Sequence, residues 1–347
     1  MTQKTTFIRD LIPGQPVDDI FLLASAQQGQ AKNGPFWSLT LTDRSGEIPT
    51  KIFSPQAQAI TSLAAGQFVR VRGLVGTYRD QPQVVADSAQ VVDPSENGLQ
   101  LADFVPASER DPEDMLADLE KLCKDNIRHK PLRVLVRNVL TDQAIKERIM
   151  PAPGAVSIHH AYAGGLVEHT LAVCRLCMSF CELYPELDRQ VLLAAAVFHD
   201  LGKAWEYAQG PVRQHTDEGR LLGHIQLGLT VIEPFIAKAL EKGLEPEVAM
   251  HLKHIIVSHH GELEFGSPKR PKTPEAFALH FADNLDAKLK TVAEAIEPTV
   301  PEEETGWSPF VRSLGRYVYK PLRTPDPVES NGDDKKDEQQ CLLPLKA

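Results

Sequence analysis

The hydrophobic pattern of residues 17–93 predicts a small β domain. Apolar and polar residues alternate there in short runs that are separated by turn-forming residues, which is typical of strands with one buried face. In the run PFWSLTLTD, Trp37, Leu39 and Leu41 are predicted to share one face, with the intervening residues on the other. Strands of this kind need a partner surface to bury their apolar face, so a compact barrel or sandwich is expected.

Turn signals indicate which β fold this is. Lys-Asn-Gly at residues 32–34 and Arg-Ser-Gly at residues 44–46 are hairpin signals, and the intervening segment 54–67 could supply a short helix. About five strands with one such helix are typical of an OB-fold, a small barrel that binds single strands by stacking bases on aromatic side chains. We therefore predict an OB-fold domain over residues 1–96.

The pattern changes to a helical period after Pro112. Asp111 is a predicted N-cap with Pro112 at the first helical position, and apolar residues then recur every three to four positions, with helices expected to about Glu297. The last residues are rich in Pro, Asp, Lys, Glu and Gln without periodicity, which predicts disorder. The predicted fold class is multidomain α and β: an N-terminal OB-fold barrel, a linker at 97–112, an all-α domain at 113–322 and a disordered tail at 323–347.

Composition limits the function classes. The formal net charge of −10 argues against a protein that coats duplex nucleic acid by bulk electrostatics. Residues 1–93 hold eight basic and eight acidic side chains, so the excess acidity lies later and a local binding channel remains open. No signal peptide and no run of 18 apolar residues are present, which predicts a soluble, cytoplasmic protein without a membrane partner.

Cysteines do not indicate a disulfide scaffold or a zinc site. Five occur in 347 residues, and Cys174, Cys177 and Cys181 are spaced as one face of a helix. A zinc site would need a second cysteine pair, which is missing. Core packing is the favoured interpretation.

The barrel region offers side chains suited to a single strand. Exposed aromatics could stack on bases and basic groups could follow the phosphates, with these candidates: Phe36, Lys51, Arg72 and Tyr78. The alternative for Phe36 is that it completes the barrel core. In the helical region, Lys269 and Arg270 lie in a basic loop that is either a phosphate clamp for the strand or an ordinary solvated loop.

Candidate metal ligands concentrate in the helical region. Twelve histidines occur and none precedes residue 129. Most lie beside acidic residues, and the candidates fall in five short segments: Glu168–Thr170, Phe198–Lys203, the surroundings of His224, Ser258–Glu262 and Phe281–Lys288. Neutral imidazoles and carboxylates are the common ligands of borderline divalent metals, so this grouping predicts a metal site.

The segment FHDLGK is the most informative of the five. It closes a strongly apolar helix, so His199 and Asp200 are expected on a buried element that ends at Gly202. A buried carboxylate is costly unless a cation compensates its charge. Lys203 follows His199 by four residues, on the same helix face if the helix persists, and could neutralise a phosphate oxygen.

The order of these residues resembles the ligand series of the HD phosphohydrolase superfamily. That series reads His169, His199, Asp200, His224, His259, His260 and Asp283. Together with the N-terminal barrel and the segments SHHGELEFGSPKRPKTPEA and HFADNLDAK, it resembles the YhaM-type 3′-to-5′ exoribonucleases over nearly the whole chain except the tail.

The resemblance implies a metal-dependent phosphodiesterase that shortens single-stranded RNA, with single-stranded DNA as a second substrate, and releases nucleoside 5′-monophosphates. It implies that His169, His199, Asp200 and Asp283 hold one divalent ion and that Asp200 bridges to a second. His224 and His259 would bind that second ion, with His260 as a further ligand or an outer residue. Asp200 and Lys203 are the expected catalytic residues. Histidine-rich sites favour Mn²⁺, with Fe²⁺, Co²⁺ and Mg²⁺ as alternatives.

Two other functions remain open from the sequence. One is an HD nucleotidase or cyclic-nucleotide phosphodiesterase with a regulatory OB-fold; the barrel favours a polymer instead. The other is a single-stranded DNA-binding protein with a silent HD domain, against which the intact ligand series argues. Near the C-terminus, GWSPFVRSLGRYVYK interleaves aromatic and basic residues. It could stack on a strand, but a helix that docks on a neighbouring subunit is favoured, which supports a homo-oligomer.

Overall fold

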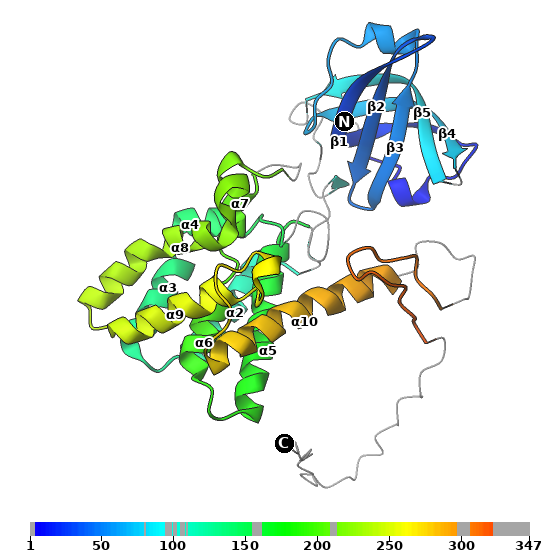
Figure 1. Ribbon diagram of the computed structural model, residues 1–347. Helices are drawn as coiled ribbons and strands as arrows, with labels where there is room; N and C mark the ends of the chain where they lie inside the picture. The colour runs from blue at the N-terminus through cyan, green and yellow to red at the C-terminus, as the bar shows by residue number, and fades with distance from the viewer. Residues whose placement is uncertain are drawn as a thin grey trace. The chain divides into compact units, whose positions relative to one another are not determined.

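The computed structural model (Figure 1) describes residues 4–79, 81–93, 99, 103–104, 108, 110–154, 162–208, 214–296 and 306–321. The chain divides into two compact units, residues 1–294 and 295–347. The predicted disordered tail lies outside the described residues, and the boundaries predicted at residues 96, 112 and 322 stay predictions. Among the described helices, none has both the length and the apolar character needed to cross a membrane.

The N-terminal part is a closed five-stranded barrel. Its strands are β1 (Pro16–Ala31), β2 (Gly34–Asp43), β3 (Gly46–Ile52), β4 (Phe68–Tyr78) and β5 (Gln81–Val92), preceded by the 3₁₀ turn η1 (Ile8–Asp10). They close in the order β1-β2-β3-β5-β4, with β3 and β5 parallel and the other pairs antiparallel. This is the predicted OB-type barrel.

The barrel core follows the predicted alternation. Trp37, Leu39 and Leu41 are buried, whereas the residues between them are partly exposed. Both predicted hairpins form, between β1 and β2 and between β2 and β3. The predicted short helix is one 3₁₀ turn, η2 (Gln56–Ala59), in which only Ala57 is buried. The chain leaves the 3₁₀ turn at Ile60, which has an extended backbone, and Leu63 is buried in the barrel core from outside any helix.

Helices make up the next part of the chain. They are α2 (Pro112–Asn126), α3 (Lys130–Leu140), α4 (Gln143–Ile149), α5 (Gly165–Leu183), α6 (Arg189–Phe198), α7 (Lys203–Glu206), α8 (Asp217–Glu241), α9 (Pro246–Ser258) and α10 (Pro274–Ile296), with the 3₁₀ turn η4 (Leu263–Phe265) before α10. Asp111 caps α2 as predicted, because its side chain accepts a hydrogen bond from the Glu113 backbone at 2.8 Å.

Helix α6 lies at the centre of this helical domain. Every residue from Val191 to Phe198 is buried, and α6 packs against α5 on one side and α9 on another (Figure 1). Cys174, Cys177 and Cys181 of α5 are buried in the same core, which agrees with the packing role predicted for them. A helix that is apolar all round can lie only inside such a core, so its end is fixed in position.

The segment at residues 306–321 is not the helix that the docking interpretation assumed. Two short backbone bridges form instead, between Trp307 and Tyr319 and between Val311 and Arg316. Gly306 and Gly315 both have positive φ, at 68° and 63°. Left-handed backbone of this kind ends helical turns and permits tight reversals, so the chain folds back on itself here.

Candidate metal centre

A turn directly after α6 carries His199 and Asp200. Both residues are buried as expected, but the helix ends at Phe198, so they lie on a turn that runs to Gly202 and not on the helix itself. The turn packs tightly against α8: a Cβ atom on Gly202 would lie 1.9 Å from the backbone oxygen of His224. Only glycine allows this approach, and the approach brings the turn next to the His224 backbone.

The first cluster of ligand-type atoms combines three elements of the helical domain. His169 comes from α5, His199 and Asp200 from the turn after α6, and Asp283 from α10, and their ligand atoms all lie within 4.8 Å of one another. The Nε2 atom of His169 is 3.1 Å from Asp283 Oδ1 and 3.3 Å from His199 Nε2. His169, His199 and Asp200 are almost completely buried.

The second cluster consists of His224, His259 and His260, whose ligand atoms again lie within 4.8 Å of one another. His224 follows Gly223, a non-helical residue inside α8 with φ 71° and ψ 160°. His259 and His260 follow the end of α9. Helix ends and a kink therefore supply all three side chains.

The Asp200 carboxylate connects the two clusters. Its Oδ2 atom lies 3.3 Å from His169 Nε2 and 3.4 Å from His199 Nε2 in the first cluster. Its Oδ1 atom lies 3.4 Å from His224 Nε2 and 3.6 Å from His259 Nε2 in the second. One oxygen thus faces each cluster, as a carboxylate shared by two ions would require.

The protein orients the imidazoles through their Nδ1 atoms. The Nδ1–H of His199 donates to the Ala196 carbonyl at 2.8 Å, and that of His259 donates to the Ile256 carbonyl at 2.7 Å. His260 donates in the same way to a backbone carbonyl, at 2.8 Å. Because a carbonyl can only accept, the proton of each neutral ring is fixed at Nδ1 and the lone pair at Nε2 faces the cluster.

Two carboxylates that the sequence analysis missed have the same role for the other two rings. Asp286 Oδ2 lies 2.7 Å from His169 Nδ1, and Glu206 Oε2 lies 3.2 Å from His224 Nδ1. Asp286 follows Asp283 by three residues on α10. That helical spacing was a signal available in the sequence for Asp286.

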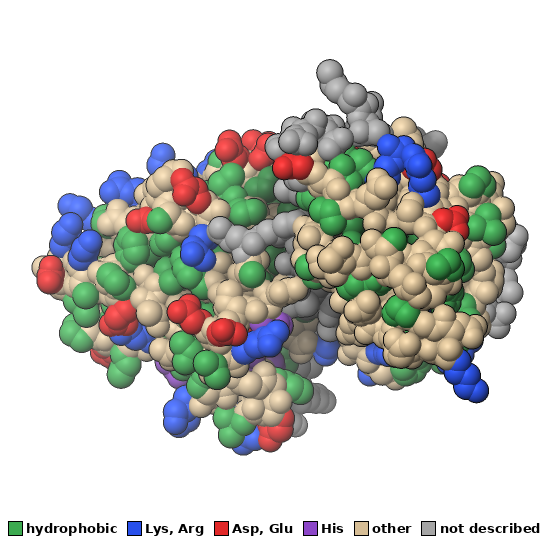
Figure 2. Space-filling view, turned by 90° about the horizontal axis from the view of Figure 1, so that it is seen from above, with side chains coloured by type: hydrophobic (Ala, Val, Ile, Leu, Met, Phe, Trp, Pro, Cys, Tyr) green, Lys and Arg blue, Asp and Glu red, His purple; other side chains and the backbone are tan. Residues whose placement is uncertain are grey.

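The unpaired atoms of the centre fit a cation. Among the described residues, Asp200 Oδ1 and the Nε2 atoms of His224 and His259 are buried without a hydrogen-bond partner, whereas Asp200 Oδ2 pairs with the Lys203 ammonium at 2.6 Å. Lone pairs of imidazole and carboxylate therefore face one another, an arrangement that a divalent ion stabilises. Figure 2 shows histidine side chains only in small patches, in line with this burial.

The pKa values of the histidines are shifted in opposite directions in the two clusters. Burial opposes charge on His169, but the neighbouring carboxylates of Asp200, Asp283 and Asp286, which accept from its ring, outweigh burial and raise its pKa well above the usual value. Burial instead lowers the pKa of His259, and burial followed by the neighbouring His259 and His224 lowers that of His260 to about 4. The first cluster thus attracts a positive charge strongly, whereas His259 and His260 of the second cluster offer neutral imidazoles.

Lys203 contacts the carboxylate rather than extending a helix face from His199. It is the first residue of α7, and its Nζ atom lies 2.6 Å from Asp200 Oδ2. Burial would raise the pKa of Asp200, but the charges of Lys203 and His199 hold it well below the usual value. The ammonium therefore lies beside the carboxylate that faces both clusters.

On the barrel, Phe36 and Lys51 lie next to each other. Lys51 Nζ is 5.1 Å from the Phe36 ring centroid and donates to Ser38 Oγ at 2.8 Å. The Phe36 ring is partly exposed and covers Gly29, where a Cβ atom would lie 2.5 Å from it. Because the side chain is only partly buried, packing on Gly29 and base stacking are compatible for this ring.

Tyr78 and Arg72 occupy the barrel strand β4. Tyr78 is 56% exposed, and the Arg79 guanidinium lies 5.3 Å from its ring centroid. Arg72 Nε is 2.9 Å from Asp18 Oδ2, in an exposed ion pair. Such pairs are weak, so Arg72 can exchange Asp18 for a phosphate at little cost.

The basic loop before α10 is exposed. Arg270 Nε lies 2.8 Å from Glu262 Oε2, and its guanidinium also approaches Glu264 at 3.9 Å. Lys269 is exposed as well. Glu262 and Glu264 reduce the positive field that Arg270 would offer to a phosphate, which weighs against the clamp interpretation at this residue.

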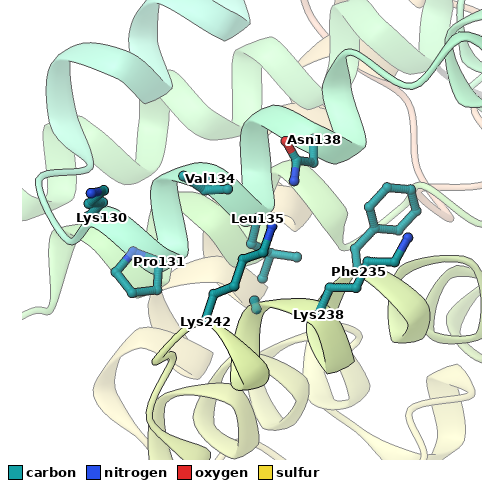
Figure 3. Close-up of a pocket in the computed structure, with 9 residues that line it drawn as sticks. Lys130, Pro131, Val134, Leu135, Asn138, Phe235, Lys238 and Lys242 are labelled. Atoms are coloured by element: carbon teal, nitrogen blue, oxygen red, sulfur yellow. The ribbon is translucent and has the colours of Figure 1, made fainter.

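A cavity of about 310 Å³ lies elsewhere in the helical domain, between α3 and α8 (Figure 3). Apolar side chains such as Leu135 and Phe235 line it together with Lys130, Lys238 and Lys242. None of its lining residues belongs to either ligand cluster. The candidate metal centre is therefore separate from this cavity.

Comparison with known proteins agrees with the division of the chain into a barrel and a helical domain. A family model described as "HD domain" matches residues 166–288, and one described as "OB-fold nucleic acid binding domain" matches residues 25–92. The HD match includes every residue of both clusters and implies a divalent metal, which these residues could hold.

Curated relatives match along most of the chain. A protein named 3′-5′ exoribonuclease YhaM from Bacillus velezensis is 35% identical over 84% of this chain and 91% of its own length. The protein of the same name from Bacillus subtilis is 34% identical over 84% of this chain and 91% of its own length. That from Shouchella clausii is 34% identical over 91% of this chain and 97% of its own length. On this identity and coverage, the chain belongs to the YhaM family of 3′-5′ exoribonucleases.

Proposed function

We propose that this protein is a metal-dependent 3′-to-5′ exoribonuclease that hydrolyses single-stranded RNA to nucleoside 5′-monophosphates. One observation carries the proposal: the buried Asp200 carboxylate directs one oxygen to each of two clusters of imidazole and carboxylate ligand atoms. The family supplies the polarity and the RNA substrate, because the relatives are named 3′-5′ exoribonucleases. The OB-fold supports binding of single-stranded nucleic acid.

In this proposal the clusters hold two divalent ions. His169, His199 and Asp283 bind one ion, and the second cluster of His224, His259 and His260 binds the other, with Asp200 shared between them. A set in which imidazoles outnumber carboxylates favours Mn²⁺, Fe²⁺ or Co²⁺ over Mg²⁺, which prefers oxygen ligands in octahedral geometry. Mn²⁺ is the ion we expect to support activity.

The reaction transfers the terminal nucleotidyl group to water. Water attacks the phosphorus of the last phosphodiester, the bond to the 3′ oxygen of the preceding nucleotide breaks, and that oxygen takes up a proton. Bound divalent ions would supply positive charge against the phosphate and favour deprotonation of the attacking water. Lys203, beside Asp200 at 2.6 Å, holds a further positive charge at the reacting phosphate.

The barrel guides the strand in this proposal. Phe36 and Tyr78 stack on bases, while Lys51 and Arg72 contact the phosphates. Both aromatic rings have exposed surface, and each has a cationic side chain beside it, Lys51 and Arg79 respectively. Because every base presents a stacking face, single-stranded DNA would bind the same surface.

The test is a time course on 5′-labelled single-stranded RNA with Mn²⁺. A ladder that shortens from the 3′ end and disappears when EDTA is added is the expected result. Chromatography of the products should give nucleoside 5′-monophosphates. Intact RNA beside rapid hydrolysis of mononucleotides or cyclic nucleotides would favour the nucleotidase alternative, and binding without any hydrolysis would favour a silent HD domain.

A further inference from the structure

The described residues 306–321, here called the C-terminal hairpin, form a small two-stranded structure. Lys320 N–H donates to the Gly306 carbonyl at 2.7 Å and Ser308 N–H to the Val318 carbonyl at 2.8 Å. Val311 N–H closes the turn on the Arg316 carbonyl at 2.9 Å. The backbone is therefore organised, although few of its side chains are buried.

Two pairs of aromatic rings lie on this hairpin. The centroids of Trp307 and Tyr319 are 4.9 Å apart, and those of Phe310 and Tyr317 are 5.2 Å apart. All four rings are largely exposed, at 60% for Trp307, 50% for Phe310, 60% for Tyr317 and 47% for Tyr319. Cross-strand pairing holds each ring against its partner and leaves much of both pairs uncovered.

The charge of the hairpin is opposite to that of the chain. Arg312, Arg316 and Lys320 are exposed, and residues 306–321 contain no Asp or Glu, whereas the whole chain carries −10. No ion pair of these three cations occurs among the described residues. Arg316 donates only to the Leu314 carbonyl of its own turn, at 3.0 Å. Three exposed cations that are close in sequence to exposed rings form a surface that matches a polyanion with planar bases.

We propose that the C-terminal hairpin is a second binding site for single-stranded RNA, in addition to the barrel. The rings stack on unpaired bases and the three cations contact phosphates. The inference rests on the proposed function, because it assigns a further contact to the same substrate. A duplex would not expose its base faces to these rings, so the ring pairs select single strands.

Charge argues for RNA over a second copy of this chain as the occupant. A second copy would bury three like charges against a protein surface and would need carboxylates placed to pair with each of them. A single strand supplies a phosphate at every nucleotide, so each cation finds a partner while the base beside it stacks.

The first experiment reverses the charges of the hairpin in the full chain: Arg312→Glu, Arg316→Glu and Lys320→Glu together. Affinity for a labelled single-stranded RNA of about 20 nucleotides is measured in EDTA at several salt concentrations. We expect affinity to fall roughly tenfold or more. The slope of log K against log salt concentration should become shallower by about 2, because each lost phosphate contact removes about 0.7 from that slope. The matched control reverses three exposed lysines that line the cavity in Figure 3, Lys130, Lys238 and Lys242, and should leave affinity near wild type.

The second experiment removes stacking and keeps the charges. Tyr317→Ala should weaken RNA binding several-fold and Tyr317→Phe should restore it, since either aromatic ring stacks on a base. Phe281→Ala, at a 57% exposed ring on α10, serves as the control and should not change affinity. Circular dichroism of each variant verifies that the fold is kept.

Several outcomes would overturn the inference. Unchanged RNA affinity in both hairpin variants would do so, as would equal losses in the hairpin and cavity-lysine reversals, which would indicate a general field effect. A change of oligomeric state by light scattering together with the loss would assign the hairpin to self-association. Turnover of a dinucleotide with Mn²⁺, measured in parallel, separates the two proposals: it reports on the metal centre and is expected to be unaffected by the hairpin changes.

Discussion

The histidines of the metal centre share one arrangement: an acceptor fixes Nδ1 and leaves Nε2 for the cluster. For His169 and His224 the acceptor is a carboxylate, supplied by Asp286 and Glu206. A carboxylate both orients the ring and makes it a better donor to a metal. Each of the two clusters contains one such ring, so each cluster can be perturbed by itself.

We predict that Asp286→Asn weakens the first ion and Glu206→Gln weakens the second. The amide keeps the size of the side chain but removes its charge, and outer partners of this kind change metal affinity by roughly 10- to 100-fold. Calorimetric titration of the metal-free protein with Mn²⁺ should show one affinity reduced and the other retained. Identical titration curves for wild type and both variants would contradict this assignment.

Sequence reasoning at this scale identified candidate ligands that the structure brings together, and missed their partners. Order and residue type singled out His169, Asp200 and Asp283, because metal ligands are commonly of those types. Asp286 and Glu206 are common surface residue types in helices, and nothing in a linear sequence shows which carboxylate accepts from which ring. Packing of α10 and α7 decides that.

At the scale of elements, backbone contact between the turn after α6 and helix α8 aligns the two clusters. Gly202 makes this contact possible, since a side chain there would meet the His224 carbonyl and the Gly228 backbone. The sequence predicted a buried element that ends at Gly202; it is buried as expected, but its helical part ends at Phe198 and a turn continues to Gly202. The polar pair His199-Asp200 interrupts the apolar run, and the turn packs closely against α8.

Gly202→Ala should therefore destabilise the helical domain and impair the metal centre. The added Cβ atom meets backbone atoms that cannot rotate away, so we expect a loss of at least about 2 kcal/mol in the free energy of unfolding. Chemical denaturation measures that loss. Gly76→Ala in the barrel, where a Cβ atom would lie 3.7 Å from its nearest neighbour, is the control and should change stability little.

The barrel surface is tested by Phe36→Ala and Tyr78→Ala. Each change should weaken binding of a long strand roughly 5- to 100-fold, the range for loss of one stacked base, and leave dinucleotide turnover largely unchanged. Fluorescence anisotropy with labelled RNA measures the binding. If both variants bind the strand as wild type does, stacking on this face of the barrel is wrong.

At the scale of the whole molecule, the sequence predicted the order of the two folds and the helical region with little error. Periodicity differs between strands and helices, and that difference survives in a single sequence. The hairpin at residues 306–321 was the exception. Its aromatic and basic residues also fit a helix, and Gly306 and Gly315, which set the reversal, give a weaker signal than a periodic pattern.

Metal removal should lower the stability of the whole enzyme. Ion binding to the folded state alone contributes about 2.7 kcal/mol at a hundredfold excess over Kd, which corresponds to a fall in Tm of roughly 5–10 °C on chelation. Calorimetry with Mn²⁺ and with EDTA measures the shift. An Asp200→Asn variant should show a much smaller shift, because the carboxylate that faces both clusters has lost its charge.

The most direct test of the account is the Asp200→Asn variant, assayed for bound Mn²⁺ per chain, RNA hydrolysis and RNA affinity on one preparation. We predict that bound metal falls and hydrolysis is abolished, while RNA affinity stays near wild type because barrel and hairpin are unchanged. Asp125→Asn, at an exposed position of α2, is the matched control and should behave as wild type. Hydrolysis at the wild-type rate in Asp200→Asn would contradict the central claim that this carboxylate joins two metal sites into one catalytic centre.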